Sequence, residues 1–319
     1  MRGIQIQRFG GPEVLEVLDL PEPEPVGGTR LYEVTAAGVN YADTHQTEDS
    51  YLAPQRLPLV PGAEFAGTGP DGRRVVGLLT GGGGYAEKVV AADALVWPIP
   101  DGVSDGAALS VVLQGVTAWH ALRTCAHLDG GESVVVHAAA GGVGTVAVQL
   151  ARAWGAGRVI AVASSAPKRD LALSLGADAT VDPAASDLTA ALREANGGAR
   201  VDVVLEMTGG PVFDASLRAL APFGRLVTYG QASRTAPAPV DPTNLMAHST
   251  AVIGFWLAHC YREPARWLTP GITELLAMLA DRRLTAVVGG TYALGDAPVA
   301  HRSLLAREST GKLVLDPRR

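Results

Sequence analysis

The sequence has little cysteine, little lysine and no excess of positive charge. Its 319 residues include only two cysteines, Cys125 and Cys260, which excludes a disulfide scaffold and any zinc site built from four thiolates. The formal net charge of −6 argues against sequence-independent binding to nucleic acid, which requires dense positive charge. Only three of its 26 basic residues are lysines, namely Lys88, Lys168 and Lys312. Codon bias towards arginine accounts for this scarcity but does not explain where lysine remains.

The N-terminus, MRGIQIQRFGG, lacks the apolar core of a signal peptide. The longest uncharged run near the middle of the chain, 133–151, is long enough to raise the question of a membrane span. His137, Gln149 and three glycines interrupt this run, which is more typical of a buried strand, a turn and a helix. We therefore expect a soluble cytoplasmic protein with reduced thiols, and neither a membrane nor a nucleic acid as its partner.

The first third of the chain contains short β-like runs separated by glycine and proline, and no long helix fits before about residue 104. The predicted strands are Ile4–Gln7, Leu15–Asp19, Arg30–Gly38, Glu64–Thr68, Arg74–Leu79 and Tyr85–Val90. A helix is predicted over Ser104–Arg123, with Ser104 as its N-cap. The elements predicted in the tail are helices Thr273–Arg282 and Asp296–Arg307 and strands Val287–Tyr292 and Lys312–Leu315. Because the first part lacks an obvious way to complete itself, we expect the tail to fold back onto it.

The middle third alternates strands with helices. The predicted strands are Ser133–His137, Arg158–Ala163, Thr180–Val181, Val201–Leu205, Arg225–Tyr229 and Thr250–Phe255. The predicted helices are Gly142–Gly155, Lys168–Leu175, Asp187–Ala195 and Val212–Ala221. Strands that consist almost wholly of Val, Ile and Leu and alternate with helices indicate a parallel sheet covered on both faces. The predicted fold class is therefore α/β, with a doubly wound parallel sheet of the Rossmann type.

A glycine-rich turn follows the first of these strands. The sequence AAAGGVG at 138–144 has the spacing Ala-x-x-Gly-x-x-Gly and opens a helix, which is the context that a dinucleotide-binding fingerprint requires. Small residues let the backbone approach a pyrophosphate, and Gly144 permits tight packing of the helix on the strand. We predict that the cofactor is bound here by Ala138, Gly141, Gly142, Val143 and Gly144.

The end of the second strand predicts which dinucleotide is bound. Sites for NAD usually carry Asp or Glu there, whereas this chain has Ser164, Ser165 and Lys168 and no carboxylate before Asp170. Hydroxyls and a cation would bind a 2′-phosphate that a carboxylate would repel. We predict that NADPH is the cofactor and that these three residues bind it. The alternative is that the two serines only end the strand and cap the next helix.

Further motifs extend over essentially the whole chain. They are AGVNYAD at 37–43, LPLVPGAEFAG at 57–67, GGYAEKVV at 83–90, LQGVTAWHAL at 113–122, AAAGGVGTVAVQLA at 138–151, LGAD at 175–178, FGRLVTYG at 223–230 and STGKLVL at 309–315. With these motifs the chain resembles the zinc-independent quinone oxidoreductases, the zeta-crystallin-like branch of the medium-chain dehydrogenase/reductase superfamily.

The resemblance implies two domains with the active site in the cleft between them. A GroES-like β-barrel domain for catalysis and substrate would comprise 1–120 and 256–319, and a Rossmann domain 121–255. Zinc-dependent relatives have Cys within the stretch that reads Ala37–Asn40 here and His where this chain has Ala63. Glu64 alone remains, and one carboxylate cannot form a three-ligand catalytic zinc site. The four-cysteine structural lobe is also missing, so no metal is expected, and electron-poor acceptors become the expected substrates.

The resemblance also implies roles for individual residues. The residues expected to be catalytic, lining the cleft near the nicotinamide, are Asn40, Asp43 and Tyr51. Those expected to contact the cofactor are Thr117, Gly230, Asn244, Phe255 and Lys312. Each has a structural alternative: Asn40 could be a turn residue, Asp43 a helix-cap carboxylate, Tyr51 a loop anchor, Thr117 a hydroxyl bonded back to its helix, and Lys312 a solvated lysine. Two of the three lysines, Lys168 and Lys312, thus fall at predicted cofactor positions.

The predicted reaction is hydride transfer from NADPH to a quinone or an activated enone, with a proton from solvent or from a hydroxyl such as that of Tyr51. The nearest alternative is reduction of a 2-alkenal or an enoyl thioester. An alternative of another class is a sensor or structural protein that binds NADPH without turnover. The apolar strand Thr250–Phe255 predicts a homodimer formed through this edge.

Overall fold

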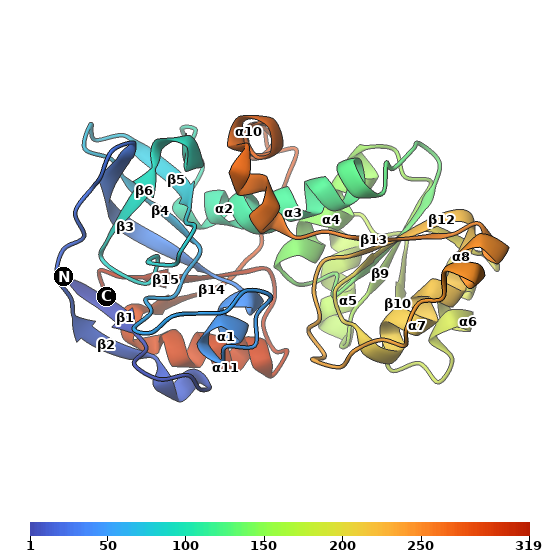
Figure 1. Cartoon of the computed structure of the whole chain (residues 1–319). Coiled ribbons are helices and arrows are strands. Elements are labelled where there is room, and N and C mark those ends of the chain that lie inside the picture. Colours follow the sequence, from blue (N-terminus) through green and yellow to red (C-terminus); the bar gives the residue numbers. More distant parts are fainter. The chain divides into compact units, whose positions relative to one another are not determined.

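The computed structural model describes residues 1–319, which divide into two compact units (Figure 1). The first unit comprises Met1–Val116 and Ala258–Arg319, and the second comprises Thr117–Leu257. Each unit has its own cluster of buried apolar side chains. None of the helices combines the length and the apolar character needed to cross a membrane.

The second unit contains a six-stranded sheet in which all strands are parallel. Its strands are β8 (Ser133–His137), β9 (Arg158–Val162), β10 (Ala179–Val181), β11 (Val201–Glu206), β12 (Leu220–Thr228) and β13 (Ala251–Gly254). The spatial order is β10-β9-β8-β11-β12-β13. The direction of winding therefore reverses between β8 and β11, and ligands of doubly wound sheets bind at the carboxyl ends of the strands flanking such a point.

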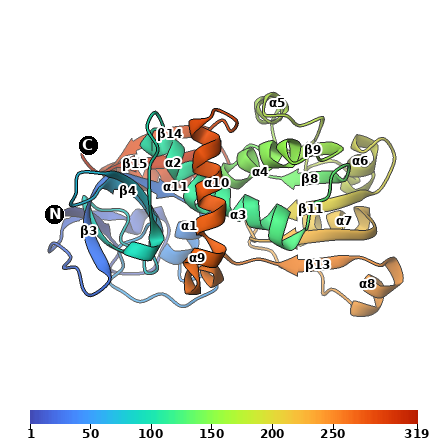
Figure 2. The ribbon, with the colours of Figure 1, turned by 90° about the horizontal axis from the view of Figure 1, so that it is seen from above.

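Helices cover both faces of this parallel sheet (Figure 2). They are α4 (Gly142–Ala153), α5 (Ala166–Ser174), α6 (Leu188–Ala195) and α7 (Gly210–Ala219), and a further short helix, α8 (Pro242–His248), precedes β13. Right-handed crossovers place α4 and α5 on one face and α6 and α7 on the other. The α/β class with a parallel sheet is confirmed. The short helix α8 was not predicted because it buries no residue and therefore carries no apolar periodicity.

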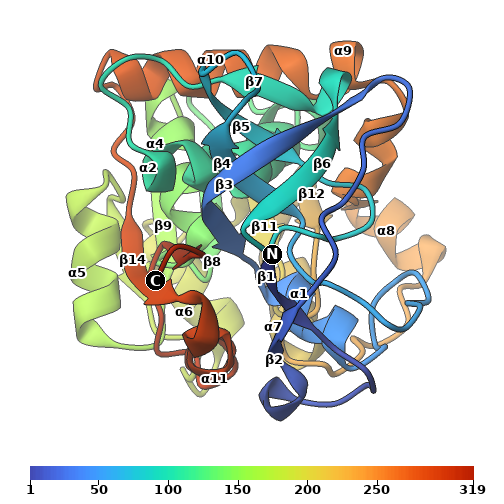
Figure 3. The same cartoon turned by 90° about the vertical axis from the view of Figure 1, so that its left-hand side faces the viewer.

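The first unit is built around a mixed sheet of seven strands (Figure 3). Its strands are β3 (Thr29–Val39), β4 (Glu64–Thr68), β5 (Arg74–Leu78), β6 (Lys88–Ala92), β7 (Val96–Pro98), β14 (Val288–Ala293) and β15 (Lys312–Asp316). The order is β14-β15-β3-β4-β5-β7, and β6 also pairs with β3. The last strand of the chain, β15, therefore lies inside the sheet between β14 and β3. Strands β1 (Arg2–Gln5) and β2 (Glu16–Asp19) form a separate antiparallel pair.

The helices of the first unit come from both ends of the chain. They are α1 (Tyr41–Thr47), α2 (Asp105–Leu109), α9 (Pro264–Trp267), α10 (Thr269–Ala280) and α11 (Ala297–Leu305). The predicted helix over Ser104–Arg123 starts at Ser104 as expected, because that hydroxyl accepts the N–H of Ala107. It is not one regular α-helix, since π-helical turns at Ser110–Gly115 and Ala121–Cys125 flank α3 (Val116–His120).

Candidate functional site

The predicted fingerprint forms a tight turn between β8 and α4. Ala138 has a φ of 48° in the left-handed region, and Gly141 is the N-cap of α4. A Cβ on Gly144 would overlap the carbonyl oxygen of Ala138 and lie 2.8 Å from the carbonyl carbon of Ala139, so only glycine fits. The first turn of α4 therefore lies close against the end of β8. Its N–H groups, which lack helical partners, face the carboxyl edge of the sheet, where an anion is bound favourably.

The end of β9 carries hydroxyls and cations. Ser164 is exposed, and Ser165 is the N-cap residue of α5 although its side chain makes no capping hydrogen bond. The alternative in which these hydroxyls serve to cap the helix is therefore not supported for Ser165. Lys168 lies in the first turn of α5 and is half-buried. The next residue, Arg169, forms an ion pair with Asp182 at 3.1 Å.

The remaining predicted cofactor residues of the second unit lie on several elements. Thr117 is buried in α3, Gly230 is exposed after β12, and Asn244 is exposed on α8. Phe255 follows β13, and its ring stacks on that of His120 with 5.2 Å between centroids. Cofactor contacts of these four residues stay predictions.

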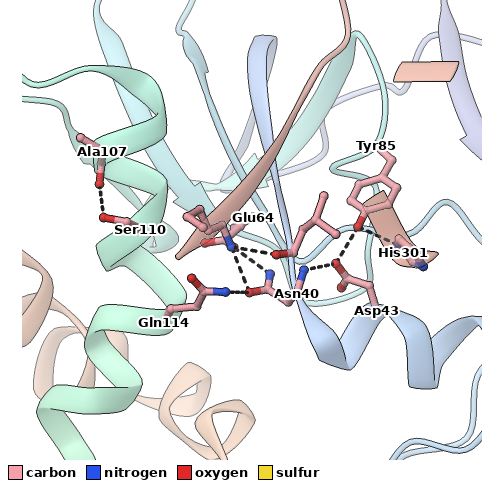
Figure 4. Close-up of polar contacts among 10 residues, drawn as sticks. Asn40, Asp43, Glu64, Tyr85, Ala107, Ser110, Gln114 and His301 are labelled. Carbon is pink, nitrogen blue, oxygen red and sulfur yellow. Dashed lines mark hydrogen bonds and ion pairs between the residues drawn. The ribbon is translucent and has the colours of Figure 1, made fainter. Parts of the chain in front are cut away.

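In the first unit, the side-chain amide of Asn40 lies at the centre of a buried polar cluster (Figure 4). Asn40 Nδ2 donates to Glu64 Oε1 at 2.7 Å. Asn40 Oδ1 accepts from Gln114 Nε2 and from Lys312 Nζ, each at 3.0 Å. Lys312 also forms an ion pair with Glu64, and both side chains are fully buried. A Cβ on Gly38 would overlap the Glu64 carboxylate, so the glycine in β3 makes room for it.

A second set of bonds holds the backbone of Asn40. Asp43 Oδ2 accepts the Asn40 N–H at 2.9 Å and the Tyr85 hydroxyl at 2.8 Å. Tyr85 Oη lies 3.1 Å from His301 Nε2, and because its proton goes to Asp43 we assign the proton of this second bond to His301 Nε2. His301 Nδ1 then needs no proton, which agrees with its lack of a partner.

Burial governs the protonation of this second set. It raises the pKa of Asp43 to about 6, opposed by the bonds from Asn40 and Tyr85 and by the charge of Lys312. Burial likewise lowers the pKa of His301 to about 4, so the imidazole is neutral at pH 7. Asp43 thus caps α1 by accepting the N–H of Asn40, which was the alternative interpretation of this residue, and its predicted catalytic role stays a prediction.

Tyr51, the third predicted catalytic residue, lies beside α1. Its ring centroid is 6.4 Å from that of His45, whose Nδ1 lies 2.9 Å from Ser50 Oγ. Burial raises the pKa of Tyr261, and the nearby Glu64 and Tyr51 add to this effect. Tyr261 therefore belongs to the same surroundings, although no sequence pattern distinguished it from other aromatic residues.

Lys312 is neither solvated nor free to bind a ligand in this arrangement. Its three N–H donors go to Glu64, to Asn40 Oδ1 and to the carbonyl oxygen of Val39 at 3.3 Å. The alternative of a solvated lysine is therefore wrong. A direct bond to a cofactor would require the exchange of one of these partners, and the prediction of such a bond stays a prediction.

Sequence reasoning missed Gln114, Tyr85 and His301. Gln114 and Tyr85 lie in motifs that were recognised, LQGVTAWHAL and GGYAEKVV, but neither was given a role. A usable signal for Gln114 was its position as a lone amide in the apolar run 107–118. His301 carried no comparable signal, because its partner Tyr85 lies 216 positions away in the sequence.

The chain is similar to known proteins over its whole length. A family model described as zinc-binding dehydrogenase matches residues 142–304. The chain is 34% identical to a quinone oxidoreductase of Pseudomonas aeruginosa, over 98% of this chain and 99% of that protein. It is 33% identical to the mouse quinone oxidoreductase, over 99% of this chain and 97% of that protein. The chain belongs to the quinone oxidoreductase family.

Solved structures of the quinone oxidoreductase family share this fold. The enzyme of Thermus thermophilus, described also in complex with NADPH, is 40% identical with a TM-score of 0.88, over 99% of this chain and 100% of that one. The Escherichia coli quinone oxidoreductase, complexed with NADPH, is 30% identical with a TM-score of 0.92, at the same coverage. The family predicted from the motifs is confirmed, and this quinone oxidoreductase family member is an oxidoreductase.

Proposed function

We propose that this protein uses NADPH to reduce a quinone or an activated enone by hydride transfer, without a metal ion. The observation that carries the proposal is the turn Ala138–Gly144 at the carboxyl end of β8, next to the point where the strand order reverses. Relatives with this fold are described in complex with NADPH. When bound, NADPH supplies a hydride with its two electrons.

The preference for NADPH over NADH rests on the end of β9. Ser164, Ser165 and Lys168 place two hydroxyls and a cation where a 2′-phosphate would lie, and the sequence has no carboxylate there before Asp170. Charge-assisted hydrogen bonds contribute about 1.5–3 kcal/mol each. One such bond corresponds to a preference of roughly tenfold to a hundredfold, and two correspond to a larger one.

The residues present do not fit a catalytic zinc ion. A zinc site needs three protein ligands, and no group of three His, Cys, Asp or Glu side chains in the structure could hold a metal. Glu64 is the one residue of the zinc-dependent pattern that this chain keeps. Its carboxylate already bonds to Lys312 and Asn40. The buried ammonium already supplies the positive charge that neutralises this carboxylate.

The first unit is proposed as a GroES-like domain that binds the substrate and carries the catalytic residues. Asn40 is held at both its backbone and its side chain, which suits a group that must keep one orientation. Asp43 holds Asn40 in place, and Tyr51 is proposed as a source of the proton that completes the reduction. The exclusion of water from the reacting groups would supply part of the catalysis.

A homodimer through β13 is also proposed. β13 is an edge strand of the parallel sheet. Two large apolar side chains near it are exposed, Phe223 at 79% and Met246 at 76%. The Phe223 N–H bonds to the carbonyl oxygen of Ser249, just before β13. Light scattering should give the mass of a dimer, and a monomer would contradict this part of the proposal.

The test is steady-state oxidation of NADPH with a panel of quinones, enones, 2-alkenals and enoyl thioesters. We expect turnover with quinones or enones and a marked preference for NADPH over NADH. Turnover with enoyl thioesters alone would assign the protein to that alternative. Tight binding of NADPH without oxidation by any acceptor would point to a binding protein and would overturn the proposal.

A further inference from the structure

The Asn40 side chain has one hydrogen-bond donor left over. A primary amide has two N–H groups and one carbonyl oxygen with two lone pairs. Both lone pairs of Asn40 Oδ1 are used, by Gln114 and Lys312, and one N–H is used by Glu64. The second N–H donates no hydrogen bond within the chain, and Glu64 Oε2 and Gln114 Oε1 of the same cluster are likewise without partners. Since buried polar groups are rarely left without a partner, this donor calls for a water molecule or a ligand.

The orientation of this amide is unambiguous. Rotating it by 180° would place its NH2 group against the ammonium of Lys312 and its oxygen against the carboxylate of Glu64. Both contacts would be repulsive, so the charges of Lys312 and Glu64 fix which side of the amide carries the oxygen. Asn40 as a whole residue is only 4% exposed, so its amide is enclosed by its neighbours.

The neighbouring charges also strengthen the remaining donor. The ammonium of Lys312 lies on the oxygen side of the amide and the carboxylate of Glu64 lies on its nitrogen side. This alignment favours the charge-separated form of the amide, in which the oxygen is more negative and the nitrogen more positive. Hydrogen bonds polarise one another in this way inside a protein of low dielectric.

The backbone support makes the donor rigid before any ligand arrives. Asp43 Oδ2 accepts the Asn40 N–H at 2.9 Å, and the Tyr85 hydroxyl holds Asp43 in turn (Figure 4). Asn40 is therefore fixed from the helix α1 side and from the sheet side. A fixed donor acts best on charge that develops during a reaction, because no reorganisation is needed at that moment.

We propose that the second Nδ2–H of Asn40 binds the acceptor's carbonyl oxygen as negative charge develops on it, and that Lys312, Gln114 and Glu64 are positioning residues that orient and polarise this donor. The inference rests on the proposed hydride transfer. In an enone, the hydride and its electron pair add to the β-carbon, the C=C π pair shifts to join the α-carbon to the carbonyl carbon, and the C=O π pair moves onto the oxygen, which gives an enolate. A proton from solvent or from the Tyr51 hydroxyl then completes the reduction. The amide takes the part that a Lewis acid plays elsewhere.

The isosteric variant Asn40→Asp removes only this donor. Two carboxyl groups this close to each other cannot both ionise, so the new side chain keeps one proton, which it donates to Glu64. Its other oxygen still accepts from Gln114 and Lys312. The three bonds and the net charge of the cluster are thus retained, while the second N–H is lost.

The first readout needs no turnover. With NADP⁺ present, 4-nitrophenol serves as an analogue of the oxyanion, and 4-nitroanisole serves as a neutral ligand of similar shape. We expect the wild-type protein to bind 4-nitrophenol as the phenolate, visible in its absorbance. Asn40→Asp should weaken phenolate binding on the order of 100-fold, the lower end of the effect of removing one oxyanion donor. Binding of 4-nitroanisole should change less than about threefold.

A second variant covers the case in which Asn40→Asp does not fold. The double variant Glu64→Gln/Lys312→Met removes the polarising pair without leaving a buried charge unpaired. It should weaken phenolate binding more than 4-nitroanisole binding. Lys88→Met, which changes a partly exposed lysine on β6, is the matched control and should affect neither ligand.

Activity adds a separate readout. In Asn40→Asp, kcat with quinones should fall on the order of 100-fold while the KM for the acceptor changes little, because the bond strengthens only as charge develops. The loss should be greater for electron-rich quinones than for electron-poor ones. A purely structural role would not produce this dependence on the acceptor.

The outcomes separate the inference from the proposed function. The inference is overturned if the wild type binds 4-nitrophenol only in neutral form or not at all, or if a folded variant loses both ligands equally or neither. A wild type that binds the phenolate but reduces no acceptor would overturn the proposed function and leave the oxyanion site standing. Normal turnover by Asn40→Asp would overturn the inference and leave the proposed function standing.

Discussion

The candidate sites of the two units place their polar groups in opposite ways. In the first unit, Asn40, Glu64 and Lys312 are buried and bond to one another. In the second, Ala138 and Ser164 are exposed at strand ends. The first arrangement resists change because each group needs the others. The second binds through backbone groups and hydroxyls that remain available, so single changes there should affect ligand binding more than folding.

Breaking the buried ion pair should have the largest effect on stability. Lys312→Met leaves the Glu64 carboxylate buried without a cation, which should lower the free energy of unfolding by about 3–5 kcal/mol. Urea denaturation measures this loss. Glu64→Gln/Lys312→Met should recover most of it, whereas Lys88→Met should leave stability nearly unchanged. If Lys312→Met were as stable as the wild type, the contrast drawn between the two candidate sites would be wrong.

The pH dependence of the first unit should report Asp43. Its pKa of about 6 in the folded state exceeds its ordinary value of 3.8, so the folded protein holds this proton more tightly than the unfolded chain. The stability that results is complete below about pH 4 and is lost as the pH rises through 6. The Asp43→Asn variant lacks this pH-dependent contribution to stability. The amount by which its free energy of unfolding falls below that of the wild type should therefore shrink by up to roughly 3 kcal/mol between pH 4 and pH 7.

Chemical denaturation at several pH values checks this expectation. The buried His137 and His301 have pKa values lowered to about 4, so each contributes stability that is lost as the pH falls from 6.5 through 4. Both are present in the variant and cancel in the difference. A deficit that does not vary with pH would mean that Asp43 does not titrate in this range.

In the second unit, Gly144→Ala tests the tight turn. The added methyl group would overlap the carbonyl oxygen of Ala138, so we expect a destabilisation of about 1–3 kcal/mol and weaker binding of NADPH. Thermal unfolding and NADPH fluorescence titration measure the two effects. Gly27→Ala, where a Cβ meets nothing within 4 Å, is the control and should alter neither.

The smallest expected effect on folding belongs to Lys168→Ala. It should leave thermal unfolding nearly unchanged and raise the KM for NADPH roughly tenfold to a hundredfold, with much less change for NADH. Arg193→Ala, at the last turn of α6, serves as a control cation on the same unit. Equal losses with both cofactors would count against the assignment of a 2′-phosphate site.

The second unit was predictable because its information is local. The turn that shapes its candidate site lies within seven consecutive residues, and strands of Val, Ile and Leu mark the sheet on either side. β8 has the predicted bounds, Ser133–His137. The two π-helical turns of the 105–125 segment escaped prediction because an apolar pattern does not distinguish them from α-helix.

The cluster in the first unit was not predictable for the opposite reason. Asn40 was selected, but its partners Glu64, Gln114 and Lys312 lie 24, 74 and 272 positions away. Each partner occurs in a recognised motif, but the motifs do not indicate which side chain of one motif contacts which side chain of another. Helix α1 is short and was missed, so the cap that Asp43 provides could not be derived either.

The position of β15 has a consequence for how the chain is made. The second unit is one uninterrupted stretch and can fold while synthesis continues. The first unit cannot, because β3 pairs with β15 and Glu64 pairs with Lys312, and both of these partners are synthesised only after the whole second unit. Until then, the end of β3 that pairs with β15, Ala37–Val39, presents unpaired backbone groups that are prone to aggregation. A ribosome that stalls before residue 312 would therefore release a chain with one finished unit and one that chaperones and proteases can recognise.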